Sequence, residues 1–210
     1  GVDDLAAVTK ANYWCNELGM DTISAGMTIA AAMEMYEKGY IPEDDIGQPL
    51  RFGDKDAMIE MVQKMAYRDG FGDALAEGSY RLADKYGHPE MAITTRKQEF
   101  PGYDPRALKG MGLAYATSNR GACHLRGYTI ASEVLGIPVK TDPLEHEGKP
   151  ELVKAFQDAT AAFDSSGLCL FTTFAWGLVD LAPQMAAACG EQFTTEELEK
   201  IGERIWNMER

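Results

Sequence analysis

Two short segments, far apart in the chain, repeat one pattern of residues that could bind a cofactor. Each has a polar acceptor, two further residues, a glycine, a large aliphatic residue and then Asp or Cys, in residues 16–21 (NELGMD) and 164–169 (DSSGLC). Because glycine adopts positive φ without steric cost, the chain can turn sharply there and expose backbone amides at the next helix start. A side-chain acceptor beside amide donors suits the polar edge of a pterin. The simpler interpretation, an ordinary helix C-cap followed by an N-cap, stays open.

A dense polar cluster lies between these two segments, in residues 118–128 (SNRGACHLRGY). His124 could donate or relay a proton near neutral pH, and Arg120 and Arg126 could pair with phosphate or ring oxygens. The alternative is a turn with a hydrogen-bonded histidine and solvated arginines. His88 and His146 are predicted at the surface of loops.

The cysteines occur in different settings. Cys169 closes the second glycine segment, where a thiolate could bind a metal or a cluster if further ligands came from elsewhere. Cys15 and Cys189 lie in apolar helical stripes, which predicts core positions for both. Four cysteines without tight spacing do not indicate a disulfide framework and favour a reducing compartment.

Apolar residues recur at helical spacing along nearly the whole chain, and no long alternating run predicts a sheet. We therefore expect an all-α, multihelical protein. Residues 110–128 show no clear period. The predicted helices cover residues 3–18, 22–39, 54–69, 73–86, 150–163, 170–189 and 194–206.

Capping signals mark several of these helix ends. Gly19 is expected in a left-handed conformation after the first helix, and Asp54 or Asp56 is expected to cap the third. Thr194 and Glu197 have the spacing of a capping box, in which each side chain satisfies a free backbone amide. These signals predict the ends of three helices without any tertiary information.

The chain is long enough for two small domains, and residues 99–110 are rich in proline and glycine. We predict two packed helical domains, residues 1–98 and 99–210. The formal net charge of -13 opposes binding to nucleic acid, and no stretch approaches the roughly 20 apolar residues of a membrane span. A cytoplasmic protein is expected, and the start at Gly1 suggests a cut or processed chain.

Four strings resemble the aldehyde ferredoxin oxidoreductase family of tungsten, occasionally molybdenum, enzymes. In chain order they are NELGMDTISAG, EFPGYDPRALKGMGLAYATSNRGACHLRGY, DSSGLCLFTTF and GERIWNMER. The resemblance implies two multihelical domains of such an enzyme, the second truncated and the N-terminal domain missing. It implies oxidation of aldehydes to carboxylic acids at a bis-pterin tungsten or molybdenum centre, with electrons passing through a 4Fe-4S cluster to ferredoxin. A homodimer is a further expectation, because family members can dimerise.

The resemblance also implies roles for single residues. The two glycine segments correspond to D-x-x-G-L pterin motifs, with Asn16 in place of the usual Asp and Met20 in place of Leu. Cys169 corresponds to a single distant cysteine ligand of the 4Fe-4S cluster, and His124 to a histidine that handles a proton near the metal. The implied cofactor contacts are Asn16, Gly19, Met20, Asp21, Arg120, Arg126, Asp164, Gly167 and Leu168.

The family's other three cluster cysteines and its active-site glutamate belong before Gly1 and are absent from this sequence. We therefore expect the chain by itself to hold no metal or cofactor and to be inactive. One alternative is a non-catalytic helical binding or assembly module with a vestigial cofactor cleft. Another is a structural interaction domain that offers methionine-rich helix faces to partners.

Overall fold

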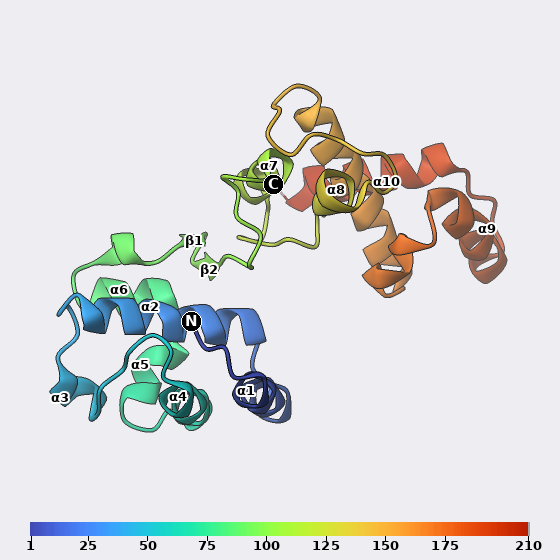
Figure 1. Ribbon diagram of the computed structural model, residues 1–210. Helices are drawn as coiled ribbons and strands as arrows, with labels where there is room; N and C mark the ends of the chain where they lie inside the picture. The colour runs from blue at the N-terminus through green and yellow to red at the C-terminus, as the bar shows by residue number, and fades with distance from the viewer. Residues whose placement is uncertain (210) are drawn as a thin grey trace. The chain divides into compact units, whose positions relative to one another are not determined.

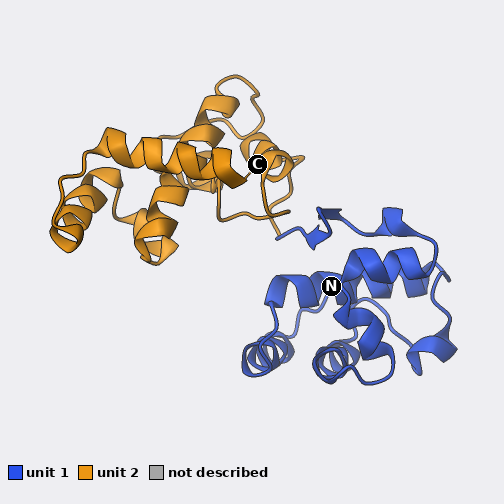
Figure 2. Ribbon diagram, turned by 180° about the vertical axis from the view of Figure 1, so that it is seen from behind, with its two compact units in different colours: residues 1–101 blue, residues 102–210 orange. Residues whose placement is uncertain are grey.

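The computed structural model describes residues 1–209, which form two compact units, residues 1–101 and 102–209 (Figure 2). Helices are the main elements of both units, and the described strands form one two-residue pair, so the predicted all-α, multihelical fold is confirmed. In the part of the chain that the structure describes, no helix is both long and apolar enough to cross a membrane. The assignment of residues 1–98 and 99–210 to two domains of one enzyme stays a prediction.

The first unit is organised around α2, which packs against α1, α4, α5, α6 and the strand β2. In Figure 1, α6 lies along α2. Its elements are α1 (Leu5–Glu17), α2 (Thr22–Glu37), α3 (Glu43–Ile46), α4 (Lys55–Tyr67), α5 (Phe71–Ala76), α6 (Ser79–Lys85), a short 3-10 helix η1 (Pro89–Met91), and the antiparallel pair β1 (Thr94–Thr95) and β2 (Gln98–Glu99).

Methionine side chains fill much of the core of this unit. Met61 and Met65 on α4 are buried, as are Met33 and Met35 on α2. An unbranched, flexible thioether fills irregular gaps between short helices. These methionines therefore act as core residues and do not form a surface groove for a partner. The N-cap of α4 is Asp54, whose carboxylate accepts from the amide of Ala57 at 2.9 Å.

The single helix predicted over residues 73–86 is wrong, because the chain breaks between α5 and α6. Gly78 there has φ +87° and ψ +163°. The buried carboxylate of Glu99 accepts the backbone N–H of Ser79 at 2.8 Å and its hydroxyl at 2.8 Å. A side chain from the hairpin thus starts α6, and a Cβ on Gly78 would lie only 3.2 Å from it.

The second unit is organised around α8, which packs against α7, α9 and α10. Its elements are α7 (Lys109–Thr117), a π-helical turn η2 (Ala131–Leu135), α8 (Lys149–Ser166), a 3-10 helix η3 (Leu170–Phe174), α9 (Leu178–Cys189) and α10 (Thr195–Glu209).

The helices α8 and α10 approach each other closely. A Cβ on Gly202 would lie 1.9 Å from the carbonyl oxygen of Asp158, so only glycine fits there. The indole Nε1 of Trp206 donates to the carbonyl of Gln157 at 2.7 Å.

The capping box predicted at the start of α10 is confirmed. The amide of Thr194 donates to the Glu197 carboxylate at 2.8 Å, and the amide of Glu197 donates to the Thr194 hydroxyl at 3.2 Å.

The helix predicted over residues 170–189 is also wrong as one element. It is divided into η3 and α9 by an extended backbone at Gly177, whose amide donates to Asp180 Oδ2 at 2.8 Å. The core position predicted for Cys189 is wrong as well, since this cysteine is exposed. Only the first turns of α9 bury residues, through Leu178, Leu181 and Ala182, so its last turn extends past the core.

Candidate functional site

The first glycine segment joins α1 to α2. Gly19 has φ +71°, and the amide of Met20 donates to the carbonyl of Cys15 at 2.8 Å, which closes the end of α1. Asp21 then caps α2 by accepting the amide of Ser24 at 2.7 Å. The left-handed conformation predicted for Gly19 is confirmed, and the turn satisfies the ends of both helices with its own groups.

The side chains of this first turn differ in exposure. Asn16 and Asp21 are exposed, and Met20 is half-buried beside a cavity of about 260 Å³ that Leu18 and Asp21 also line. Cys15, predicted as a core residue, is buried, and this burial raises the pKa of its thiol. Asn16 is thus placed to accept a hydrogen bond from outside the unit, whereas Cys15 stays a protonated core group.

The second glycine segment joins α8 to η3. Gly167 has φ +79°, and its amide donates to the carbonyl of Asp164 at 3.2 Å. Leu168 is half-buried and packs against the core, while Cys169 is exposed with an extended backbone. The turn therefore leaves a thiol at the surface two residues after a left-handed glycine and five residues after the carboxylate of Asp164.

Arg126 connects the polar cluster of residues 118–128 to the C-terminal ends of two helices, α8 and α10. Its Nη1 lies 2.6 Å from Glu209 Oε2 at the end of α10, and its Nε lies 3.5 Å from Asp164 Oδ2 at the end of α8. Asn119 donates to the same Glu209 carboxylate. The family resemblance implies that Arg126 and Asp164 contact the same cofactor. In the structure these two side chains lie next to each other.

This arrangement fits a ligand that carries hydrogen-bonding groups. The Arg126 side chain is only 18% exposed, and its buried Nε has no hydrogen-bond acceptor among residues 1–209. The Asp164 side chain is still 37% exposed. The Asp164 carboxylate at 3.5 Å from this Nε compensates its charge without a hydrogen bond, so an acceptor brought within hydrogen-bond distance of Arg126 would be favoured.

His124 lies half-buried among aromatic rings. Its ring centroid is 5.5 Å from that of Tyr103 and 6.3 Å from that of Tyr128. The two phenol oxygens are 3.4 Å apart. Burial, helped by the hydrogen bond with Tyr103, raises the pKa of Tyr128 to about 12. An imidazole beside two phenols has the groups needed to hold or pass on a proton.

Arg120 has a different environment from Arg126. Its side chain is exposed, and its Nε and Nη2 lie 3.0 and 2.9 Å from the sulfur of the buried Cys123. The contact between Arg120 and Cys123 was not expected from the sequence.

The other two histidines lie outside this cluster. His146 is exposed as predicted. His88 is half-buried and stacks on Tyr40, with 3.6 Å between the ring centroids.

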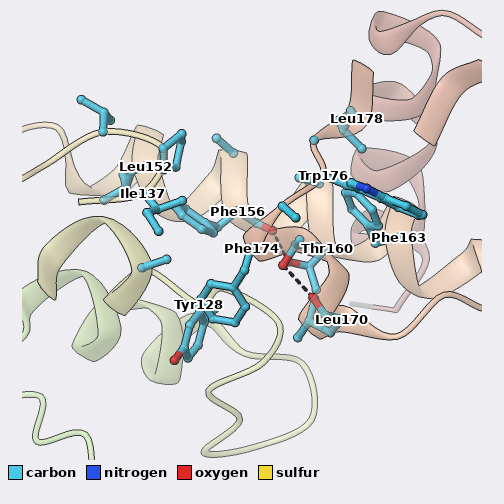
Figure 3. Close-up of a pocket in the computed structure, with 18 of the residues that line it drawn as sticks. Tyr128, Ile137, Leu152, Phe156, Thr160, Phe163, Leu170, Phe174, Trp176 and Leu178 are labelled. Carbon is cyan, nitrogen blue, oxygen red and sulfur yellow. Dashed lines mark hydrogen bonds between the residues drawn. The ribbon is translucent and has the colours of Figure 1, made fainter. Parts of the chain in front are cut away.

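An apolar cavity of about 580 Å³ opens beside this cluster (Figure 3). Tyr128 lines it and meets Phe174 edge to face at 5.9 Å. Because Phe174 belongs to η3, the cavity adjoins both the polar cluster and the segment that follows the second glycine turn. Other lining residues include Ile137, Leu152 and Phe156 toward one end and Phe163, Trp176 and Leu178 toward the other.

Cys169 is the candidate metal ligand of this chain. Within residues 1–209, no three His, Cys, Asp or Glu side chains come together to hold a metal ion. A 4Fe-4S cluster is held by four cysteine thiolates, so Cys169 could contribute only one of them. Asn16, Gly19, Met20 and Asp21 belong to the first unit and the other candidates to the second, and the convergence of both sets on one cofactor stays a prediction.

Together these features define an all-helical protein with two helix–glycine–helix turns, one of which is tied to a loop that carries histidine and arginine. The chain belongs to the aldehyde ferredoxin oxidoreductase family, since the family model for domains 2 and 3 of these enzymes matches residues 1–210.

Relatives with known names agree with this assignment. The chain is 53% identical to a tungsten-containing aldehyde ferredoxin oxidoreductase of Pyrococcus furiosus and 52% identical to that of Thermococcus kodakarensis. Each match covers 100% of this chain and 35% of the relative, so the chain spans about a third of their length. It is also 27% identical to the WOR-like subunit of an aliphatic sulfonate oxidoreductase of Pyrococcus furiosus, over 100% of this chain and 32% of that protein.

A solved structure has the same fold. It is the active site complex BamBC of benzoyl coenzyme A reductase with 1,5-dienoyl-CoA, which matches with a TM-score of 0.69. The match covers 91% of this chain and 36% of that one at 18% sequence identity. At this identity the similarity concerns the fold alone.

Proposed function

We propose that this chain is part of a tungsten–pterin oxidoreductase that oxidises aldehydes to carboxylic acids and passes the electrons through a 4Fe-4S cluster to ferredoxin. The observation that carries the proposal is the family match over the whole chain, at about half identity to enzymes named for this reaction. The formed glycine turns and the contact between Arg126 and Asp164 support it.

The chain's own residues would hold the cofactor as follows. Gly19 and Gly167 let the two turns form, and Asn16 and Asp164 accept hydrogen bonds from pterin N–H groups. Arg126, with its unused Nε hydrogen, donates to a pterin or phosphate oxygen. Met20, Asp21 and Leu168 shape the two turns, and Arg120 is a proposed contact through the resemblance.

Cys169 supplies one thiolate to the cluster, and its exposure leaves it accessible to the iron. When bound, the metal–pterin centre supplies the capacity to accept two electrons from the substrate. His124, placed between two phenols, takes or returns the proton that leaves as the aldehyde is oxidised.

The proposal is tested with the intact protein, purified without oxygen and loaded with cofactor. His124→Ala should lower aldehyde-dependent reduction of ferredoxin by roughly 10²- to 10⁴-fold, because general acid–base groups contribute about that much. Tungsten and pterin content should stay at the wild-type value. His146→Ala, which changes an exposed loop histidine, is the matched control.

Two results would count against the proposal. Unchanged turnover in His124→Ala would remove this histidine from the reaction. A wild-type intact protein that contains neither tungsten nor iron would instead favour a non-catalytic binding or assembly module with a vestigial cleft.

A further inference from the structure

One buried carboxylate contacts residues on either side of the loop that carries His124. Glu133, in η2, is 1% exposed and makes an ion pair with the buried Lys149. A charge in the interior is costly unless other groups satisfy it. Here four donors do so: the amide of Gly110 at 2.8 Å, the amide of Met111 at 3.2 Å, the hydroxyl of Thr129 at 3.0 Å and the ammonium of Lys149 at 2.8 Å.

These donors come from both sides of the polar cluster. Gly110 and Met111 lie in the first turn of α7, and α7 ends at Thr117, directly before residues 118–128. Thr129 follows the cluster directly. The same carboxylate therefore fixes the segment that enters the loop and the segment that leaves it. Lys149 is the first residue of α8, so its ion pair ties the Glu133 carboxylate to the central helix of the unit.

The backbone at the start of α7 is adapted to this carboxylate. A Cβ on Gly110 would lie 2.9 Å from Glu133 Oε1 and 2.9 Å from Thr129 Oγ1, so a larger residue would displace both groups. A negative charge at the N-terminus of a helix is also favourable, because the free amides there carry partial positive charge. Both the close packing at Gly110 and the polarity of α7 therefore favour a carboxylate at the start of this helix.

We propose that Glu133 is a positioning residue for His124. Glu133 accepts a hydrogen bond from Thr129, the neighbour of Tyr128, and the Tyr128 ring lies next to the His124 ring, tilted by 59° with 6.3 Å between the ring centroids. It acts through the loop and not on the substrate. The consequence for catalysis rests on the proposed role of His124 in proton transfer, whereas the effect on the position of His124 does not.

The position of His124 can be measured in the 210-residue chain by nitrogen-15 NMR. The chain has three histidines, and His88 lies in the first unit, so its ring signals serve as an internal reference. In Glu133→Gln, the ring signals and titration midpoint of His124 should shift while those of His88 stay. A folded Glu133→Gln chain with unchanged His124 signals would overturn the inference.

A second variant covers the case in which Glu133→Gln does not fold, because that change leaves the Lys149 ammonium buried without its partner. Glu133→Gln combined with Lys149→Met removes both charges and keeps an oxygen for the amides of α7. This double variant should fold and show the same His124 shift, whereas wild-type His124 signals in it would overturn the inference.

Turnover of the loaded intact protein separates positioning from chemistry. Glu133→Gln should lower kcat roughly 10- to 100-fold with little change in KM, because a small displacement of a catalytic group has an effect of that size. Glu133→Asp, which keeps the charge, should recover part of the loss. A shifted His124 signal with unchanged kcat would support the positioning and overturn the catalytic role of His124 instead.

Discussion

The two glycine turns have the same backbone form but different surroundings. Gly19 and Gly167 have φ of +71° and +79°, and each lies three residues after a polar residue in the last turn of a helix. At the first turn that residue is the neutral, exposed Asn16. At the second it is Asp164, whose charge at a helix C-terminus would be unfavourable without the guanidinium of Arg126 at 3.5 Å. The turn itself is thus set locally by glycine, whereas its chemistry is set by groups that tertiary structure brings in.

The largest expected effect concerns the thiol that only the second turn carries. Cys169→Ser should abolish the 4Fe-4S cluster in the loaded intact protein, because serine is not a thiolate ligand. Cys189→Ser is the matched control, since both cysteines are exposed. Iron and sulfide analysis with visible absorbance measures the result. A full complement of iron and sulfide in Cys169→Ser would exclude this cysteine as a ligand.

A smaller effect is expected from the arginine that distinguishes the second turn. Arg126→Ala should lower the free energy of unfolding of the chain by about 2 kcal/mol, because Asp164 and Glu209 lose their shared, largely buried cation. Arg120→Ala removes an exposed guanidinium and should cost less than about 1 kcal/mol. Denaturant unfolding measures both changes in the free energy of unfolding. Equal losses in the two variants would show that Arg126 stabilises the chain no more than the exposed Arg120 does.

The smallest effect tests the feature that the turns share. Gly19→Ala and Gly167→Ala should each destabilise the chain by about 1 kcal/mol, because an L-residue is strained at positive φ. A Cβ would meet no atom within 4 Å at either position, so no clash adds to this cost. The two losses should agree to within about 0.5 kcal/mol, because both glycines are exposed and surface substitutions without special contacts vary by about that much. A markedly larger loss at one glycine would show that the turns are not equivalent.

Features fixed by neighbouring residues could be predicted from the sequence. The all-helical fold, the left-handed Gly19, the Asp54 cap and the Thr194–Glu197 capping box all depend on contacts within a few positions. Cys15 was placed correctly in a core, where Ala7 and Ala11 of the same helix are buried with it, although Leu5 and Val8 of the predicted stripe are exposed.

Features fixed by contacts between distant residues could not be predicted from the sequence. Glu99 starts α6 from 20 positions away, and no local pattern signals that break. The exposure of Cys189 depends on where the core of the second unit ends. Glu209 and Arg126 are 83 positions apart, and the contact between Glu133 and Gly110 spans 23. The candidate site residues follow from the family resemblance, whereas their partners, such as Glu209 for Arg126, follow from the tertiary structure.

The most direct test of this account is a crystal structure of the intact protein with its cofactors bound. The account predicts that pterin nitrogens lie within about 3.2 Å of the side-chain oxygens of Asn16 and Asp164, and that the sulfur of Cys169 is bonded to iron. Pterins held by other residues, with both glycine turns facing solvent and Cys169 away from the cluster, would contradict it.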